Sequence, residues 1–327
     1  MGNEAGGSGT SGPTTPEQIR NVVLVGPAAA GKSSLFERLI SARTPGRHAR
    51  GEPAASSALK AASVASGAVY VNLLDTPGHP DFVGEVRAGL RAADAVLFVV
   101  AASGDIDEAT RLLWRECEVI GVPRAVAVTK LEQSRGDFDE TVARCRRVFG
   151  DAQPIDFPLL TEGGGARLVN LLRRTVADYR EGAATVRQPD EEEAALIEDR
   201  RGPLMESIIE ESEDEVLLER HLNGEDIEFE TVAADLRAAI ATARFYPVVA
   251  THAPSGMGIE ELFDLFEHGF PSPVAASLPS IQTATGKDFG AVSCDPAGPL
   301  VAEVVRTVSD PFVGRLSLVR VLSLIHI

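Results

Sequence analysis

The stretch Gly26-Pro27-Ala28-Ala29-Ala30-Gly31-Lys32-Ser33 decides the fold of this chain of 327 residues. Two glycines bracket four residues and are followed by lysine and serine, which is the pattern of a phosphate-binding loop. A short apolar run, residues 22–25, precedes it, and a segment with helical spacing, residues 33–42, follows it. Because this motif requires a strand before it and a helix after it, the sequence predicts a P-loop nucleotide-binding fold.

Each residue type in this stretch has a physical reason to be there. Glycine lets the backbone wrap closely around a phosphate, and the amides at the start of the following helix then point toward it. Lys32 is expected to reach the β and γ phosphates, and the Ser33 hydroxyl is expected to ligate Mg²⁺. The predicted nucleotide-binding residues of the loop are Gly26, Pro27, Ala28, Ala29, Ala30, Gly31, Lys32, Ser33 and Ser34.

A second motif, Asp75-Thr76-Pro77-Gly78-His79, follows a predicted strand at 69–74. An aspartate that leaves a strand beside the phosphate loop holds Mg²⁺ in P-loop enzymes, so Ser33 and Asp75 are the predicted metal ligands. Gly78 is expected to offer its backbone amide to the γ-phosphate, and His79 to face the attacking water as the catalytic residue. A lone histidine is more often structural, but the four residues before it favour the catalytic role.

Strands and helices alternate along the first 150 residues. Such alternation implies right-handed crossovers and a mostly parallel sheet with helices on both faces, so the predicted fold class is α/β. Beyond the segments already given, strands are predicted at 95–101 and 124–129, and helices at 81–93, 108–120 and 138–149.

The alternation then stops. Residues 161–201 contain three consecutive glycines, one weak strand at 168–172 and charged linker, and residues 203–243 have the pattern of acidic amphipathic helices. A strand at 246–251 and a helix at 259–268 restore the α/β pattern. The sequence therefore predicts an acidic helical subdomain inserted into the α/β domain.

Acidic residues concentrate in this insert. Between Glu181 and Asp235 there are 19 acidic and 4 basic residues, so this segment holds most of the net charge of −17. The charge argues against binding to nucleic-acid phosphates, and no direct DNA binding is expected. The acidic block is either a solvated face or a surface for a basic partner, and the sequence leaves both open.

Other sequence features argue against membrane, secreted and metal-cluster proteins. The longest apolar run, residues 92–102, is interrupted by Asp94 and is too short to cross a bilayer. Residues 1–16 lack the regions of a signal peptide and predict a disordered tail. The cysteines have no metal-ligand spacing and fit buried or idle thiols in a reducing cytoplasm, so we expect a cytoplasmic protein without membrane partners. These cysteines are Cys117, Cys145 and Cys294.

Several motifs together resemble a known family. The stretch Asp-Thr-Pro-Gly-His-Pro-Asp-Phe, residues 75–82, is similar to the third GTPase motif of translational GTPases. Further stretches resemble elongation factor G, and bacterial elongation-factor-G-like paralogues in particular, over nearly the whole chain beyond the tail. They are Gly121-Val122-Pro123-Arg124, Pro247-Val248-Val249, Phe270-Pro271-Ser272-Pro273 and Asp310-Pro311-Phe312-Val313-Gly314-Arg315-Leu316. The resemblance implies a protein that binds GTP and GDP with Mg²⁺ and hydrolyses GTP, with His79 positioning the water.

The motifs for guanine depart from the family pattern. The family's Asn-Lys-x-Asp is here Thr129-Lys130-Leu131-Glu132, and its Ser-Ala is His252-Ala253. The resemblance implies that Lys130 lies along the base, that Glu132 accepts hydrogen bonds from it and that the Ala253 backbone amide meets O6. Each weakened polar contact costs about 1–3 kcal/mol, so we expect weaker or less selective guanine binding. The predicted base-contacting residues are Thr129, Lys130, Glu132, His252 and Ala253.

The segment that corresponds to switch I departs further. The family carries Arg-Gly-Ile-Thr there, and its threonine completes the Mg²⁺ shell, whereas residues 44–67 are a short run rich in Ala, Ser and Gly. Ser56 or Ser57 could substitute, and a loop without a metal ligand is the alternative. This departure counts against rapid turnover more than against nucleotide binding.

The resemblance also divides the chain into parts. They are a GTP-binding domain at 17–274 with its insert at 155–245, a linker at 275–298 and the start of a β-barrel second domain at 299–327. The insert matches the part of elongation factor G that meets the ribosomal stalk protein, so the ribosome is the expected partner of a monomer. Two β-rich segments, 300–307 and 316–322, predict one hairpin. A single hairpin leaves strand edges unpaired and apolar surface exposed, so we expect it to be poorly ordered or prone to aggregation in isolation. We also expect residues 321–327 to be foreign sequence at a broken gene end.

Four functions remain open from the sequence. The first is a GTPase in a ribosome-linked step, either elongation with translocation or ribosome recycling. The second is a degenerate paralogue that binds guanine nucleotide with little or no turnover, and the third is a ribosomal protection factor. An ATP-specific P-loop enzyme is least favoured, because Lys130 and the motif of Asp75 would have no role in it.

Overall fold

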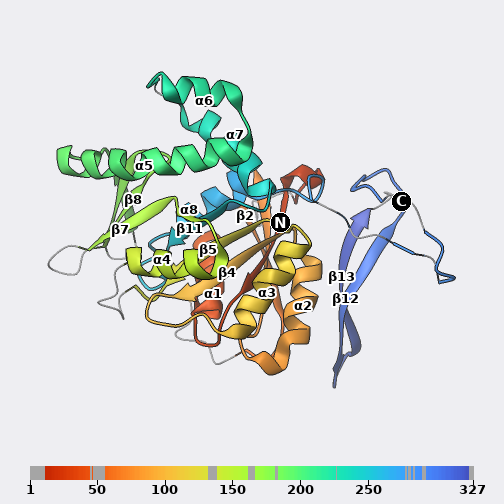
Figure 1. Cartoon of the computed structure of the whole chain (residues 1–327). Helices are drawn as coiled ribbons and strands as arrows, with labels where there is room; N and C mark the ends of the chain where they lie inside the picture. Colours follow the sequence, from red (N-terminus) through yellow and green to blue (C-terminus); the bar gives the residue numbers. More distant parts are fainter. Residues whose placement is uncertain are drawn as a thin grey trace, which may run out of the picture.

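A seven-stranded sheet forms the centre of the computed structural model, in the order β2-β3-β1-β4-β5-β11-β6 (Figure 1). β2 runs antiparallel to β3, and every other neighbouring pair is parallel. The strands are β1 (Ile19–Val25), β2 (Lys60–Ser66), β3 (Val69–Asp75), β4 (Ala95–Ala101), β5 (Arg124–Thr129), β6 (Ala152–Pro154) and β11 (Tyr246–Ala250). The structure describes residues 12–44, 46, 56–131, 138–160, 166–180, 183–225, 227–276, 278, 281–282, 284–288 and 292–323. The predicted α/β fold is confirmed.

Helices cover both faces of the sheet (Figure 1). On one face α1 lies beside α8, where Arg43 pairs with Glu260 at 2.6 Å. On the other face α3 and α4 meet through stacked rings of Trp114 and Phe149, 4.1 Å between centroids. No helix in the described ranges is long and apolar enough to cross a membrane. The helices are α1 (Lys32–Arg43), α2 (Val83–Ala92), α3 (Glu108–Val119), α4 (Phe138–Phe149) and α8 (Ile259–Asp264).

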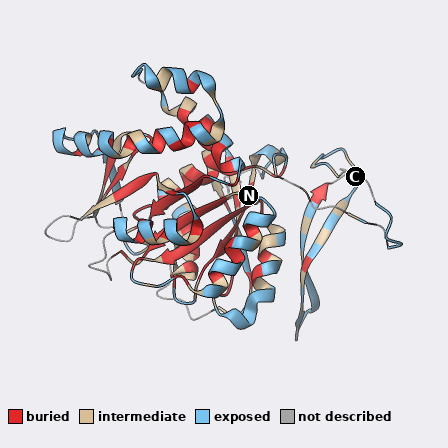
Figure 2. Ribbon diagram, viewed as in Figure 1, coloured by how far each residue is buried: buried red, intermediate tan, exposed pale blue. Residues whose placement is uncertain are grey.

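The central strands are apolar on both sides because helices cover both faces. Every residue of β5 and β11 is buried, and so is all of β4 except its last residue. Figure 2 shows this core as the buried strands, with exposed surface on the outer sides of the helices. The unbroken apolar runs therefore predicted these strands correctly, with bounds within one residue.

Three local differences from the sequence prediction have physical reasons. β2 was not predicted, because only Val64 in its Ala- and Ser-rich sequence has high strand propensity. It forms through its pairing with β3. The helix predicted at 81–93 begins at Val83, because Pro80–Phe82 form a 3₁₀ turn first. The helix predicted at 259–268 ends at Asp264 and continues as one π turn, Leu265–Gly269.

The insert contains a sheet as well as helices, which corrects the prediction of a helical subdomain. β7, β8, β9 and β10 form an antiparallel sheet in the order β10-β9-β8-β7, and the helices lie above the main sheet (Figure 1). The region predicted as charged linker also contains the start of the longest helix, α5, which has Pro203 in its interior rather than at its start. The elements are β7 (Asp156–Leu160), β8 (Ala166–Asn170), β9 (Thr175–Arg180), β10 (Ala183–Arg187), α5 (Glu191–Ser212), α6 (Glu215–Leu222) and α7 (Phe229–Ala241).

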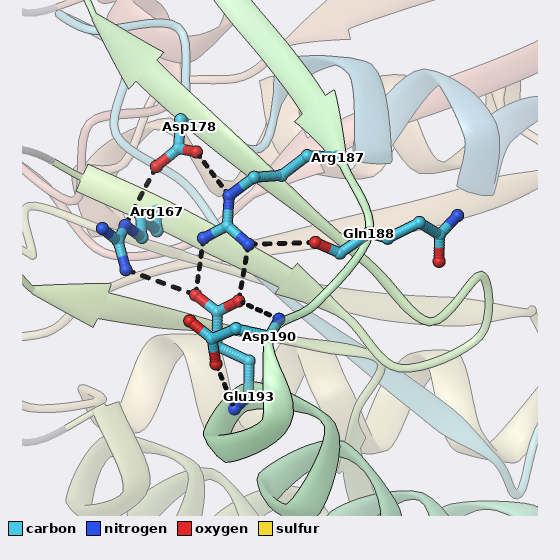
Figure 3. A network of polar contacts seen from close by, with 6 residues as sticks. All are labelled: Arg167, Asp178, Arg187, Gln188, Asp190 and Glu193. Carbon is cyan, nitrogen blue, oxygen red and sulfur yellow. Dashed lines mark hydrogen bonds and ion pairs between the residues drawn. The ribbon is translucent and has the colours of Figure 1, made fainter.

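The charged side chains of these strands led to the prediction of a linker, but in the structure they form ion pairs with one another and with α5 (Figure 3). Arg187 of β10 binds Glu193 of α5 with two hydrogen bonds of 2.6 Å and binds Asp178 of β9 at 2.9 Å. Arg167 of β8 joins the same two carboxylates at 2.9 and 3.2 Å. Glu193 also forms a capping box with Asp190, and its bonds with Arg187 lower its pKa to about 2. The network therefore fastens one face of the insert sheet to the start of α5.

The predicted hairpin is present as β12 (Val301–Asp310) and β13 (Gly314–Ser323). It packs along α2 (Figure 1). Leu322 and Val305 are buried, whereas Val304 and Val321 are each 54% exposed, so the predicted exposed apolar surface is confirmed for one side of the hairpin. The last residues of the expected foreign tail, 324–327, lie outside the described residues.

Three arginine contacts hold the hairpin to α2 and its end. Arg91 pairs with Glu303, and Arg320 pairs with Asp94 while donating to the carbonyls of Arg91 and Ala93. Arg306 donates to Glu85 at 2.9 Å. The same carboxylate accepts the N–H of Leu59 at 2.9 Å. These contacts explain why the hairpin packs on the core, which its sequence does not reveal.

We expect Arg320→Ala to lower the free energy of unfolding by about 3 kcal/mol, because it leaves the Asp94 carboxylate buried without its counter-charge. The side chain of Asp94 is 1% exposed and that of Arg320 10%. Arg91→Ala is the matched control, since Arg91 is 60% exposed and its pair with Glu303 should contribute about 0–1 kcal/mol. Urea unfolding of both variants measures the difference, and equal losses would contradict the assignment.

Candidate nucleotide-binding site

The phosphate loop connects β1 to α1, as predicted. Gly26 has a φ of 152°, and a Cβ there would lie 2.2 Å from the carbonyl oxygen of Val99, so only glycine fits. Ala29 has a φ of 61°, an uncommon conformation for a residue with a side chain. The loop closes through the N–H of Ala30, which donates to the carbonyl of Pro27 at 3.3 Å. This backbone leads directly into the first turn of α1, whose free N–H groups favour an anion.

Lys32 lies against the loop that it follows. Its Nζ donates to the carbonyls of Gly26 and Pro27 at 2.8 and 2.7 Å, and the residue is only 5% exposed. Burial lowers the pKa of Lys32 to about 8, although Asp75 opposes this shift. The amino group is thus held at the loop by two neutral carbonyls, where a phosphate would supply negative charge as a stronger acceptor.

Ser33 and Asp75 meet beside the loop. The register pairs Leu24 of β1 with Asp75 of β3, so the carboxylate emerges next to the start of α1. Ser33 Oγ donates to Asp75 Oδ2 at 2.7 Å, while Asp75 Oδ1 is buried and has no hydrogen-bond partner in the described part of the chain. Burial raises the pKa of Asp75 above its usual value. A hydroxyl and a buried carboxylate are hard oxygen donors, and they fit Mg²⁺, which takes few protein ligands together with phosphate and water.

Gly78 packs directly against the phosphate loop. A Cβ on Gly78 would lie 2.5 Å from Lys32 Nζ and 2.7 Å from the backbone N of Ala28, so a side chain here would displace the loop. Asp75 and Gly78, which are predicted to contact Mg²⁺ and the γ-phosphate, therefore both lie against the loop and the start of α1.

His79 lies at the edge of the same site. Its side chain is 60% exposed, and Nδ1 accepts the N–H of Asp81 at 3.3 Å. The imidazole lines a cavity of about 210 Å³ together with Gly26, Gly78 and residues of α2 and α3. The ring is therefore accessible from solvent and adjacent to the loop.

The first predicted base-recognition motif begins at the end of β5. Thr129 is 4% exposed, and its Oγ1 donates to the carbonyl of Ala30 at 2.6 Å. The side chain thus contacts the phosphate loop through its hydroxyl. Lys130 has a φ of 57° at the turn that follows, and Leu131 is buried. Glu132 lies outside the described residues.

The second predicted base-recognition motif lies in the loop between β11 and α8. Thr251 fastens this loop to β5, since its N–H donates to Val128 O at 2.7 Å. His252 Nδ1 is 2.7 Å from Ser255 Oγ, so the imidazole is engaged inside the loop. The backbone N–H of His252 donates to Met257 O. Ala253 is partly exposed at the following position. Because β5 and β11 are adjacent parallel strands, both motifs leave the same edge of the sheet.

A protein-family model described as the elongation factor Tu GTP binding domain matches residues 17–272. Elongation factor G-like proteins of Mycobacterium tuberculosis, from strains CDC 1551 / Oshkosh and ATCC 25618 / H37Rv, are each 44% identical over 94% of this chain.

The chain belongs to the elongation factor G family of translational GTPases.

The solved structures agree with this assignment. A crystal structure of a protein from Thermus thermophilus matches 94% of the chain with a TM-score of 0.78 and 30% sequence identity. The chain spans 45% of the length of the mycobacterial relatives and 46% of the Thermus chain. It therefore spans less than half of the length of each of these proteins.

The predicted site residues converge, within the described part of the chain, on one edge of the main sheet. The phosphate loop, Asp75, Gly78 and Thr129 are in direct contact, and the second base-recognition loop leaves the same edge. Within the segment predicted to correspond to switch I, residues 44–67, positions 45 and 47–55 lie outside the described residues. Ser56, which follows them, donates to Ala58 O at 2.8 Å.

Sequence reasoning missed one contact of the site. Thr76 is 1% exposed, and its hydroxyl donates to the carbonyl of Leu24 at 2.6 Å, which ties the motif of Asp75 to β1. A threonine directly after the aspartate was visible in the sequence. The contact of its hydroxyl with Leu24 could not be predicted, because it depends on β3 lying beside β1.

Proposed function

We propose that this chain binds GTP and GDP together with Mg²⁺ and hydrolyses GTP to GDP and phosphate. One observation carries the proposal: the buried carboxylate of Asp75, whose Oδ1 lacks a partner among the described residues, lies within 2.7 Å of the Ser33 hydroxyl at the end of the phosphate loop. A buried polar atom without a partner is unfavourable unless a ligand satisfies it. The family assignment supplies the class of ligand.

The roles of the residues follow from their positions. Ser33 and Asp75 would hold Mg²⁺, which would neutralise the charge of the phosphates. The loop amides and Lys32 would bind the β and γ phosphates, and the backbone amide of Gly78 would contact the γ-phosphate. Lys130, Glu132 and the Ala253 backbone amide would recognise the guanine.

We assign His79 to positioning the attacking water. Water attacks the γ-phosphorus, the bond between this phosphorus and the bridging oxygen breaks, and GDP leaves without a covalent enzyme intermediate. His79 would orient the water through a ring nitrogen. Its Nδ1 accepts the N–H of Asp81, so Nε2 is the nitrogen that remains for this task.

A second candidate, a guanine-nucleotide-binding protein with little turnover, is favoured by Thr129. Where the family has asparagine, the Thr129 hydroxyl keeps the contact with the phosphate loop at Ala30 but has no amide to offer the base. Nucleotide binding would then be retained with reduced affinity or selectivity.

For the whole protein we propose a cytoplasmic, monomeric factor that acts on the ribosome. The step would be elongation with translocation, recycling or ribosomal protection, and the insert would meet the stalk protein. The division into a GTP-binding domain at 17–274, a linker at 275–298 and a second domain from 299 belongs to this proposal. The acidic first turn and exposed glutamates of α5 support a basic partner surface.

Fluorescent GDP, GTP and ADP titrated against the purified chain, with and without Mg²⁺, test the proposal. We expect GDP and GTP to bind in a Mg²⁺-dependent manner and ADP to bind at least tenfold more weakly. Phosphate release with and without ribosomes then separates the two candidates, since binding without release supports the second. A folded chain that binds no guanine nucleotide would refute both.

A further inference from the structure

Two buried side chains of the insert sheet contact the residues that flank the loop that we assign to guanine recognition, one on each side of it. We call residues 251–258, which connect β11 to α8, the base loop. The side chains are those of Asp156 on β7 and Tyr179 on β9, and neither belongs to the predicted site.

The strand register places these two residues on the same face of the insert sheet. Asp156 pairs with Asn170 of β8, and Tyr179 pairs with Ala166 of the same strand. Ala166 and Asn170 are four residues apart, so their side chains point to the same face of the sheet. Because side chains alternate between faces, Asp156 and Tyr179 share one face. Asp178 and the arginines of the ion-pair network occupy the other face, toward α5 (Figure 3). One face of the sheet is thus fastened to α5 and the other meets the base loop.

Asp156 holds the strand that leads into the base loop. It is 0% exposed, and its Oδ1 accepts the N–H of Ala250, the last residue of β11, at 2.8 Å. Its Oδ2 is buried with no hydrogen-bond partner among the described residues, and burial raises the pKa of Asp156 well above its usual value. A buried carboxyl group is unfavourable for packing alone, so its presence at this junction indicates a specific positioning role.

Tyr179 holds the other end of the base loop. Its hydroxyl donates to Glu261 in the first turn of α8, with 3.0 Å to Oε2 and 3.3 Å to Oε1, and this helix begins directly after Gly258, the last residue of the loop. A Cβ on Gly258 would lie 2.1 Å from the carbonyl oxygen of Ala250. The two ends of the loop are therefore in contact, and both are fixed to the same sheet face.

We propose that Asp156 and Tyr179 are positioning residues for guanine recognition, which fix both ends of the base loop so that the Ala253 amide is held for guanine O6. The inference rests on the proposed function, since it assumes that Ala253 contacts the base. The insert sheet then supports base selectivity in addition to carrying the acidic helices.

The test is Tyr179→Phe in the full chain, with two fluorescent ligands. One is GDP, and the other is the diphosphate of 2-aminopurine riboside, which lacks O6 but keeps the ribose and phosphates. Losing the hydroxyl should raise the Kd for GDP by about 3- to 10-fold and change the Kd for the analogue less than about twofold. The discrimination between the ligands should therefore fall, which a merely structural loss would not cause.

Tyr246→Phe is the matched control. Tyr246 is 5% exposed, like Tyr179 at 6%, and its hydroxyl donates to Ala243 O at the opposite end of β11. This variant should lower the melting temperature without changing the ratio of the two affinities. An unchanged GDP affinity in Tyr179→Phe, or an equal weakening of both ligands, would overturn the inference alone. A parent chain that binds no GDP, or that does not prefer GDP to the analogue, would overturn the proposed base contact and the inference with it.

Discussion

Replacing Lys32 with alanine is expected to weaken GDP and GTP binding by about 100-fold or more. The Lys32 amino group is held at the phosphate loop by two carbonyls, at 2.7 and 2.8 Å, so it is ready to exchange them for phosphate oxygens. Charge-assisted hydrogen bonds contribute about 1.5–3 kcal/mol each, and losing two of them corresponds to this change in Kd. Fluorescent GDP titration measures the loss. Lys287→Ala, in the exposed segment before the hairpin, is the control and should bind like the parent.

The same lysine gives the site a defined pH dependence. Burial lowers the pKa of Lys32 to about 8 in the free protein, whereas phosphate binding needs the charged form. Affinity should therefore be constant below pH 8 and fall by about tenfold per pH unit above it. Lys32→Ala should lack this decrease. If the variant retains the parental affinity, the phosphate site has been assigned wrongly.

His79→Ala is expected to leave GTP binding unchanged and to lower ribosome-stimulated hydrolysis by about 100- to 10,000-fold, the usual contribution of a positioned catalytic side chain. The reason is positional: His79 lies next to Gly78, which touches the phosphate loop, yet its ring makes no contact with the loop residues among the described interactions. Single-turnover phosphate release at saturating GTP measures the effect.

His221→Ala provides the comparison for this prediction. His221 lies in the last turn of α6, in the insert, and should leave hydrolysis unchanged. Parental hydrolysis by the His79 variant would exclude the catalytic assignment. A loss of binding in that variant would instead show that the imidazole supports the fold of the motif.

The sequence predicted those parts of the site whose structure is determined by residues that are neighbours in the chain. Gly26 to Ser33 form their loop because glycine conformations and a helix start are encoded in neighbouring residues. Asp75 was placed by the strand before it, and strand order then brought it to Ser33. The α/β fold was likewise predictable, because short apolar runs indicate buried strands and apolar residues at helical spacing indicate helices.

The parts that the sequence missed depend on partners distant along the chain. The charged residues Arg167, Asp178 and Arg187 were interpreted as part of a linker. Their ion pairs form only when three strands and a helix come together, which the local sequence does not indicate. The packing of the hairpin on the core was not predicted, because no residue near Arg320 in the sequence indicates its pairing with Asp94, which is 226 residues away. The positions of Asp156 and Tyr179 also follow from sheet register, which no local pattern fixes.

The arrangement around α2 has a mechanical consequence. The segment before this helix rests on the phosphate loop through Gly78, while Glu85, Arg91 and the residues at its far end are joined to the hairpin by arginine contacts. Because contacts hold both the segment before α2 and the far end of α2, the helix cannot tilt without straining one set of these contacts. We therefore expect a ligand that displaces Gly78 to shift α2 and, through the arginine contacts, the hairpin as well.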